Sequence, residues 1–238
     1  MPWIGALSSL WNRAKLYKLL SSRAWTSSGI CLVCGGLDAD ASGVCGGCLA
    51  DFPRRQKSRL TRTIASVDVA YAAYRYEFPI TNLIKSAKFH ADLGALALLQ
   101  VGFAHTFEAH LGEIDFLVPV PLSPWRFVHR GFNQAGELAR SLGNASGKPV
   151  RYDLVTRLRG WNAPQSLLGA AARHENMKGA FRATAEVKGA QIAIVDDVIT
   201  TGATCSSMAD VLRAAGAARI VAMAVAATPP RCHEDGRT

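Results

Sequence analysis

Short apolar runs separated by helical patterns make up most of the chain. Runs of β-branched and aromatic residues predict strands, one or two of them within Ile64–Tyr76 and one each in Phe116–Leu122 and Ala218–Ala227. The run Ile192–Val195 is short, continuous and bounded by turn signals, which is typical of a buried strand in a parallel sheet. Helical spacing predicts four helices, which begin at Pro79 and Asn133 and span Leu93–Phe107 and Cys205–Ala215.

The first residues carry apolar side chains at near-helical spacing with basic residues between them. Over Trp3–Trp25 this pattern predicts a helix, and we assign residues 1–29 as an N-terminal basic helix. We favour an interpretation in which its apolar side docks on the rest of the protein. The alternative is a basic amphipathic helix for a membrane surface or nucleic acid. At the other end, residues 231–238 are expected to form a frayed tail.

The stretch Gln191–Thr204 carries the most specific chemistry. Two carboxylates follow its apolar run, a Thr- and Gly-rich turn follows them, and a predicted helix comes next. The backbone N–H groups and hydroxyls of the turn, together with the helix dipole, favour a phosphate. The acids, Asp196 and Asp197, repel a phosphate and instead suit the neighbouring hydroxyls of a sugar or a divalent cation. Together these features describe a site for a ribose 5-phosphate.

This stretch resembles the phosphoribosyl pyrophosphate (PRPP) signature of the type I phosphoribosyltransferases. The resemblance implies that Asp196 and Asp197 orient the ribose as catalytic residues. It also implies a loop around the 5-phosphate, formed by Thr200, Thr201, Gly202, Ala203 and Thr204. The alternative is an ordinary strand whose acids end it and cap the next helix, which requires several coincidences.

Two CxxC pairs, Cys31/Cys34 and Cys45/Cys48, lie ten residues apart. Each pair can turn two thiolates toward one ion, and four thiolates in a tetrahedron suit Zn²⁺ in a closed, structural site. We therefore predict a four-cysteine zinc-binding module over residues 30–60. Four free thiols, two redox disulfides and an iron–sulfur cluster are the alternatives.

Composition limits the class of protein. With 238 residues, of which 49% are hydrophobic, the chain can hold one substantial domain plus a small appendage, and disorder of the whole chain is excluded. The net charge of +9 suits a polyanionic ligand or nucleic acid, although many proteins that bind neither are basic. Basic residues cluster in Arg54–Arg62. No transmembrane segment or signal peptide is evident, so we expect a cytoplasmic protein.

A second candidate phosphate site lies upstream. The predicted strand ending at Leu122 leads into a loop with Arg126, Arg130 and a glycine, followed by a helix. The motif VPVPLS…RGFNQA, with the later residues Arg159, Pro164-Gln165 and Gly179-Ala180-Phe181, is similar to the ComF family. That family is a branch of the phosphoribosyltransferase fold with members linked to DNA uptake in competence and to gluconate utilisation, and its members commonly carry an N-terminal cysteine-pair zinc module.

The resemblance implies an α/β fold of the type I phosphoribosyltransferase kind, a parallel sheet flanked by helices, over residues 61–230. PRPP with Mg²⁺ is expected at the carboxyl edge of the sheet, with Arg126 or Arg130 on the pyrophosphate. The segment Arg157–Phe181 lies where the parent fold keeps a mobile lid, and the alternative is a basic surface loop and helix.

Three hypotheses of function follow. The first is an active phosphoribosyltransferase whose acceptor no residue pattern identifies. The second is an adaptor that binds single-stranded DNA or a DNA-uptake or recombination protein. The third is a regulator that senses PRPP or a nucleotide without turnover, because fold alone does not establish activity.

Overall fold

The computed structural model describes residues 29–31, 33–39, 44–158 and 179–229. Most of the predicted N-terminal helix, the interior of the predicted lid and the predicted tail lie outside the described residues. Within the described ranges, no helix has the length and apolar character needed to cross a membrane.

Four parallel strands form the central sheet in the order β1-β6-β5-β2. The strands are β1 (Val69–Arg75), β2 (Phe116–Pro119), β5 (Gln191–Ile199) and β6 (Arg219–Ala227). Strand β6 is buried along its length except at its first residue, and β5 is buried over Ile192–Val195 and at Ile199. Their near-continuous apolar sequences follow from this position, because helices cover both faces of a parallel sheet.

Three helices cover one face: α3 (Ile80–Phe89), α4 (Leu93–Phe107) and α6 (Gln134–Ser146). The short 3-10 helix η1 (Glu108–His110) extends α4. Alternate residues of the central strands, such as Val195 and Met223, point into this layer. Helix α4 is apolar on nearly every side because it lies between the sheet and its neighbouring helices.

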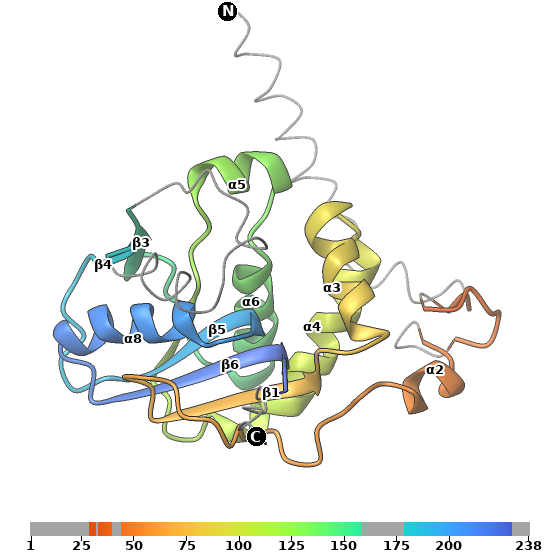
Figure 1. Ribbon diagram of the computed structural model, residues 1–238, viewed down its shortest axis with the longest axis horizontal. Helices are drawn as coiled ribbons and strands as arrows, with labels where there is room; N and C mark the ends of the chain where they lie inside the picture. Colours follow the sequence, from red (N-terminus) through yellow and green to blue (C-terminus); the bar gives the residue numbers. More distant parts are fainter. Residues whose placement is uncertain (1–28, 32, 40–43, 159–178, 230–238) are drawn as a thin grey trace, which may run out of the picture.

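The other face packs against α8 (Ala203–Ala214), with Ile194 and Ala222 of the sheet turned toward it. A small antiparallel pair, β3 (Val155–Arg157) and β4 (Phe181–Ala183), lies beside α8 on this side (Figure 1). The two ends of the predicted lid, Arg157 and Phe181, are therefore partners in one ladder.

Several predicted elements are confirmed, and one expectation is wrong. Helix α4 has the predicted bounds, whereas α8 begins two residues earlier than expected and takes in Ala203 and Thr204. The segment with Arg126 and Arg130 is not a loop but the helix α5 (Pro124–Arg130). Ser123 caps this helix through its side chain, Pro124 occupies its first position, and Gly131 ends it with a φ of 79°.

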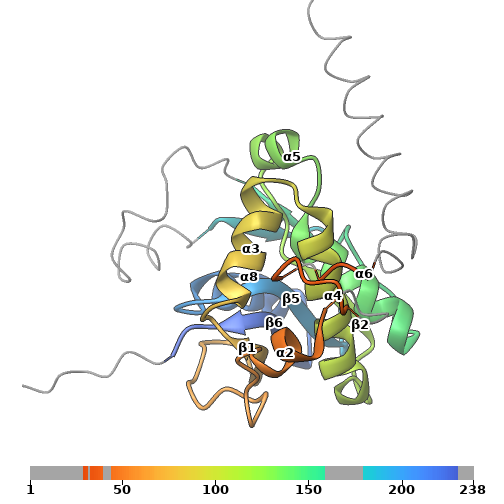
Figure 2. The same ribbon diagram turned by 90° about the vertical axis from the view of Figure 1, so that its right-hand side faces the viewer.

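The cysteine module contains the short helix α2 (Gly46–Ala50), which lies at one side of the molecule in Figure 1 and faces the viewer in Figure 2. Cys31, Val44 and Phe52 join the same buried cluster as α3 and α4. After Phe52, the chain runs antiparallel along β1. Its backbone pairs with β1 in isolated β-bridges, Arg54 with Tyr74 and Arg59 with Tyr71. The exposed edge of the sheet is thereby covered.

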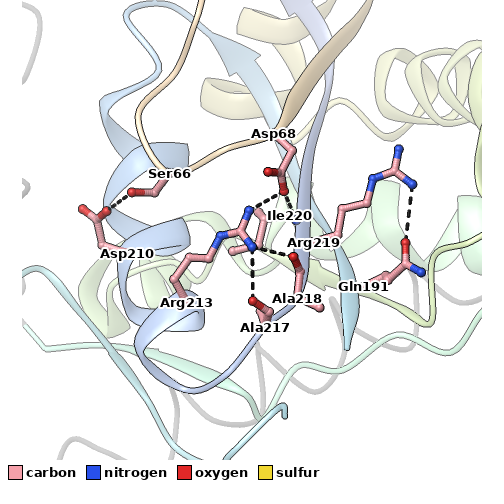
Figure 3. Close-up of polar contacts among 9 residues, drawn as sticks. All are labelled: Ser66, Asp68, Gln191, Asp210, Arg213, Ala217, Ala218, Arg219 and Ile220. Carbon is pink, nitrogen blue, oxygen red and sulfur yellow. Dashed lines mark hydrogen bonds and ion pairs between the residues drawn. The ribbon is translucent and has the colours of Figure 1, made fainter. Parts of the chain in front are cut away.

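Polar contacts tie the amino ends of the strands to the end of α8 (Figure 3). Asp68 accepts hydrogen bonds from the Ile220 N–H at 2.7 Å and from the Arg213 guanidinium. Arg213 also donates to the carbonyls of Ala217 and Ala218. These contacts set the position of α8 relative to β1 and β6.

Candidate functional site

An open cavity lies at the carboxyl ends of three parallel strands. Tyr76 follows β1, Val120–Leu122 follow β2, and Asp196 and Asp197 lie near the end of β5. Its volume is about 220 Å³, several times the ~30 Å³ that a water molecule occupies in the liquid. The cavity therefore has room for a small polar ligand, at the edge where open α/β sheets bind ligands.

The acid pair faces a lysine from another element. The Lys88 ammonium, on the last turn of α3, lies 2.5 Å from a carboxylate oxygen of Asp197. The side chains of Lys88 and Asp197 are 24% and 15% exposed, so water screens this ion pair only weakly. Asp196 accepts a hydrogen bond from the Asp197 N–H at 2.8 Å. Each acid thus has a different partner.

These different surroundings shift the pKa values of the two acids in opposite directions. Burial raises the pKa of Asp196 to about 8, and the negative charge of Asp197 adds to the rise. Burial also acts to raise the pKa of Asp197, but the charge and hydrogen bond of Lys88 outweigh it and the pKa falls below its usual value. At neutral pH the pair therefore holds about one proton and one negative charge.

The predicted phosphate loop joins β5 to α8. Thr200 and Thr204 line the cavity, and the Thr201 hydroxyl accepts a hydrogen bond from the Ala203 N–H. Gly202 stands at the N-cap with a φ of 86°. The first N–H groups of a helix have no intrahelical carbonyl partner, so the start of α8 offers donors and a positive dipole end to an anion.

Three arginines line the same cavity: Arg126 and Arg130 from α5 and Arg157 from β3. Burial lowers the pKa of Arg130 and of Arg157, and the charge of Arg126 lowers both further. Arg130 and Arg157 nevertheless remain protonated at neutral pH. Their mutual repulsion is relieved by an anionic ligand, and with Lys88 they outnumber the two acids of the cavity.

The four cysteines form a separate candidate metal centre. The sulfur atoms of Cys31, Cys34, Cys45 and Cys48 all lie within 4.8 Å of one another, and the Cys34 and Cys45 sulfurs are 3.7 Å apart. A tetrahedral site with metal–sulfur bonds of about 2.3 Å has edges of about 3.8 Å. The cluster therefore fits a four-coordinate thiolate metal site.

Backbone N–H groups support the thiolates. The Cys45 N–H points at the Cys31 sulfur, the Gly36 N–H at the Cys34 sulfur and the Cys48 N–H at the Cys45 sulfur, each at 3.4 Å. Burial raises the pKa of the Cys31 thiol, but backbone hydrogen bonds outweigh it and lower that pKa to about 6. A lowered pKa favours the thiolate, which is the form that binds metals.

Comparison with known proteins agrees with this geometry. The phosphoribosyl transferase domain model matches residues 128–237. "DNA utilization protein YhgH" of Salmonella typhimurium is 34% identical over 197 residues, covering 80% of this chain and 81% of that protein. "Competence protein F" of Haemophilus influenzae is 30% identical over 184 residues, covering 74% and 75%. "Competence protein ComFC" of Bacillus subtilis is 31% identical over 176 residues, covering 74% and 68%.

This chain belongs to the ComF family. The acid pair, the predicted phosphate loop and Arg130 fall inside the matched phosphoribosyl transferase domain, whereas the cysteine cluster lies before it. A parallel sheet flanked by helices, preceded by a cysteine cluster, is the predicted architecture and is confirmed.

Of the predicted ligand-site residues, six line the cavity of this ComF-family chain: Arg126, Arg130, Asp196, Asp197, Thr200 and Thr204. Thr201, Gly202 and Ala203 of the loop are not among the lining residues. The cavity also has side chains that sequence reasoning missed, Lys88 and Tyr76 among them. Lys88 pairs with Asp197 from a helix over a hundred residues earlier, and Tyr76 joins the cavity wall after β1. No local motif marks either residue. The sequence could have indicated only the region in which they lie, because the segments that follow parallel strands meet at one edge of the sheet.

The acid pair generates a stability prediction for this ComF protein. Because the folded-state pKa of Asp196 lies near 8, well above the unfolded value near 4, folding becomes less favourable as pH rises between these values. The substitution Asp196→Asn keeps a carbonyl oxygen for the Asp197 N–H and removes the charge. Its melting temperature should exceed that of the wild type, with a difference that grows by about 5–9 °C from pH 6 to pH 8.

The matched control is Asp153→Asn. Arg151 holds the pKa of the exposed Asp153 carboxyl at about 2, so its contribution to stability is constant from pH 6 to pH 8. Thermal unfolding at several pH values tests both variants. A difference between Asp196→Asn and wild type that does not change with pH contradicts the assignment.

Proposed function

We propose that this protein binds PRPP, or a nucleotide with a ribose 5-phosphate, and transfers the phosphoribosyl group to an acceptor. One observation carries the proposal: the acid pair, the phosphate loop and three arginines converge on one cavity. These groups match the three parts of PRPP. The 5-phosphate suits the start of α8, the ribose diol suits Asp196 and Asp197, and the pyrophosphate suits Arg126 and Arg130.

The charge state of the acids fits a diol. Ionised Asp197 can accept a hydrogen bond from one ribose hydroxyl, while protonated Asp196 retains an acceptor oxygen and a donor. Mg²⁺ also fits the cavity, because carboxylate oxygens are hard ligands and Mg²⁺ keeps most of its waters. When bound, it would neutralise charge on the pyrophosphate.

The protein's task in such a transfer is positioning and charge stabilisation. The bond from the anomeric carbon to pyrophosphate breaks and a bond from that carbon to the acceptor forms, by way of an oxocarbenium-like state. Arg126, Arg130 and Arg157 are placed to take up the negative charge of departing pyrophosphate. Asp197 carries the negative charge that favours a cationic ribose.

A second candidate function is an adaptor that binds single-stranded DNA in DNA uptake. The names of the relatives, which refer to DNA utilization and competence, support this setting. Helix α5 supports direct contact. Trp125, Phe127 and Val128 are 63%, 51% and 60% exposed, and they alternate along the helix with the cavity arginines. In both views α5 lies at the end of the molecule far from β1 and α2 (Figures 1 and 2). Exposed aromatic rings beside arginines suit stacked bases.

We also propose that the cysteine cluster holds one structural Zn²⁺. Four thiolates fill a tetrahedron and leave no open position for catalysis. The module buries Cys31, Val44 and Phe52 against the main core, so its folding and its docking depend on the same few residues.

PRPP binding is tested by titration calorimetry with PRPP and Mg²⁺. The double variant Asp196→Ala/Asp197→Ala should lose roughly 10- to 100-fold in affinity, because the hydrogen bond to the one ionised carboxylate, Asp197, contributes about 1.5–3 kcal/mol. Asp210→Ala, on the exposed side of α8, is the matched control and should bind as wild type does. Absence of heat with the wild type contradicts the proposal.

Transfer is tested separately by pyrophosphate release from PRPP with a panel of bases. Release in the presence of one base, lost in the double acid variant, is expected for an enzyme. Binding without release across the panel identifies a PRPP sensor instead.

DNA contact is tested with a single-stranded oligonucleotide at several salt concentrations. Affinity should fall steeply as salt rises, and Trp125→Ala/Phe127→Ala should weaken it about 10-fold or more, since stacking contributes ~1–3 kcal/mol per base. Leu37→Ala removes an 84% exposed apolar side chain of the cysteine module and serves as the control. Equal affinity for both variants excludes α5 as the contact.

Metal analysis of the purified protein should give one zinc per chain. Cys48→Ser should lower the zinc content and the melting temperature, because structural zinc contributes folding free energy. Cys205→Ser changes a buried thiol of α8 outside the cluster and should keep the metal. A wild-type zinc content near zero contradicts the assignment.

A further inference from the structure

Arg62 contacts the backbone at the start of the predicted phosphate loop. One guanidinium nitrogen donates to the Ile199 carbonyl at 2.7 Å, and another donates to the Thr200 carbonyl. Within the described part of the chain, Arg62 is not among the residues that line the cavity. Its two guanidinium nitrogens therefore form hydrogen bonds with the backbone of the loop, and they do not occupy the space that a ligand would take.

This contact determines how two peptide groups of the loop point. A trans peptide is planar, so its carbonyl and its N–H point in opposite directions. The carbonyls of Ile199 and Thr200 face Arg62, and the N–H groups of Thr200 and Thr201 consequently face away from it. Thr228 reinforces the arrangement, because its N–H donates to Ile199 and its hydroxyl to Thr200, both at 3.2 Å.

A second residue of the same segment, Ile64, packs closely against the loop at Gly202. A Cβ added to Gly202 would lie 2.8 Å from the Ile64 side chain, closer than side chains pack. Ile64 is buried and its backbone pairs with Val67 in a tight turn. The loop is thus held at Ile199–Thr200 by hydrogen bonds and at Gly202 by packing.

The position of Arg62 is itself determined by the edge of the sheet. The chain that leaves the cysteine module pairs along β1, with the Leu60 N–H donating to the Ala70 carbonyl at 2.7 Å. The Ala72 N–H donates to the Ser58 carbonyl at 2.8 Å. This pairing ends two residues before Arg62. A residue near the cysteine module in sequence is therefore fixed against the ligand site.

We propose that Arg62 is a positioning residue for phosphate binding: its guanidinium fork holds the Ile199 and Thr200 carbonyls outward so that the following N–H groups are available to an anion. The proposal rests on the proposed function, since it assumes that the loop receives the phosphate of PRPP or of a related sugar phosphate. The fork matters more than the charge, because two carbonyls must be held at once.

Two variants separate the fork from the charge. Arg62→Lys keeps the positive charge but has a single ammonium, whereas Arg62→Met keeps neither. Arg59→Met is the matched control, since it removes a charge from the same basic segment at an exposed position. Circular dichroism and exchange protection of β6 establish that each variant is folded.

The first measurement is amide hydrogen exchange in the ligand-free protein. Both Arg62 variants should exchange faster than wild type across residues 199–204, by about 10-fold, with β6 unchanged and Arg59→Met like wild type. Unchanged exchange in both variants overturns the proposal. This measurement needs no ligand, so it decides the role of Arg62 even if the wild type binds no sugar phosphate, an outcome that contradicts the proposed function alone.

The second measurement is calorimetry with two probes, ribose 5-phosphate and inorganic pyrophosphate. Both Arg62 variants should bind ribose 5-phosphate about 10-fold more weakly and pyrophosphate within about twofold of wild type. Wild-type affinity for ribose 5-phosphate in Arg62→Lys overturns the proposal, because charge and not geometry is then what the loop requires. Equal losses for both probes also overturn it, because the effect is then not specific to the loop.

Discussion

Two adjacent carboxylates at the end of a buried strand are the constraint on which this site depends. Two neighbouring negative charges cannot both persist in a buried place, so the structure supplies a cation and leaves a proton. Lys88 provides the cation at 2.5 Å from Asp197, and burial keeps the proton on Asp196. Arrangement of α3 against the sheet therefore determines the chemistry of residues at the end of β5.

The remaining charge of the cavity is positive, and it comes from elements that are far apart in sequence. Helix α5 supplies Arg126 and Arg130 and strand β3 supplies Arg157, while α8 presents its amino end. Parallel strands make this possible, since the segments that follow them meet at one edge. Donors and cations thus surround a small cavity that suits an anion, opposite a single negative charge.

The cysteine module and the ligand site are parts of one continuous framework. Phe52 packs edge-on against Tyr74 of β1 at a centroid distance of 5.8 Å, the next residues pair along the same strand, and Arg62 and Ile64 then contact the phosphate loop. On the other side of the cavity, α5 turns arginines inward and aromatic side chains outward. The proposed sugar-phosphate site and the proposed contact with DNA therefore lie on opposite sides of one helix.

Sequence alone determined the bounds of α4, the cysteine cluster and the acid–loop–helix order, because local periodicity and short-range spacing encode these features. The parallel α/β class came from the resemblance of its motifs to the ComF family. The sequence also indicated Arg126 and Arg130, although it placed them on a loop where Ser123, Pro124 and Gly131 delimit a helix. Tertiary structure alone decided that Lys88 compensates Asp197 and that Arg62 holds the loop. Both contacts join residues more than a hundred positions apart, and only the packing of the sheet and its helices brings such residues together.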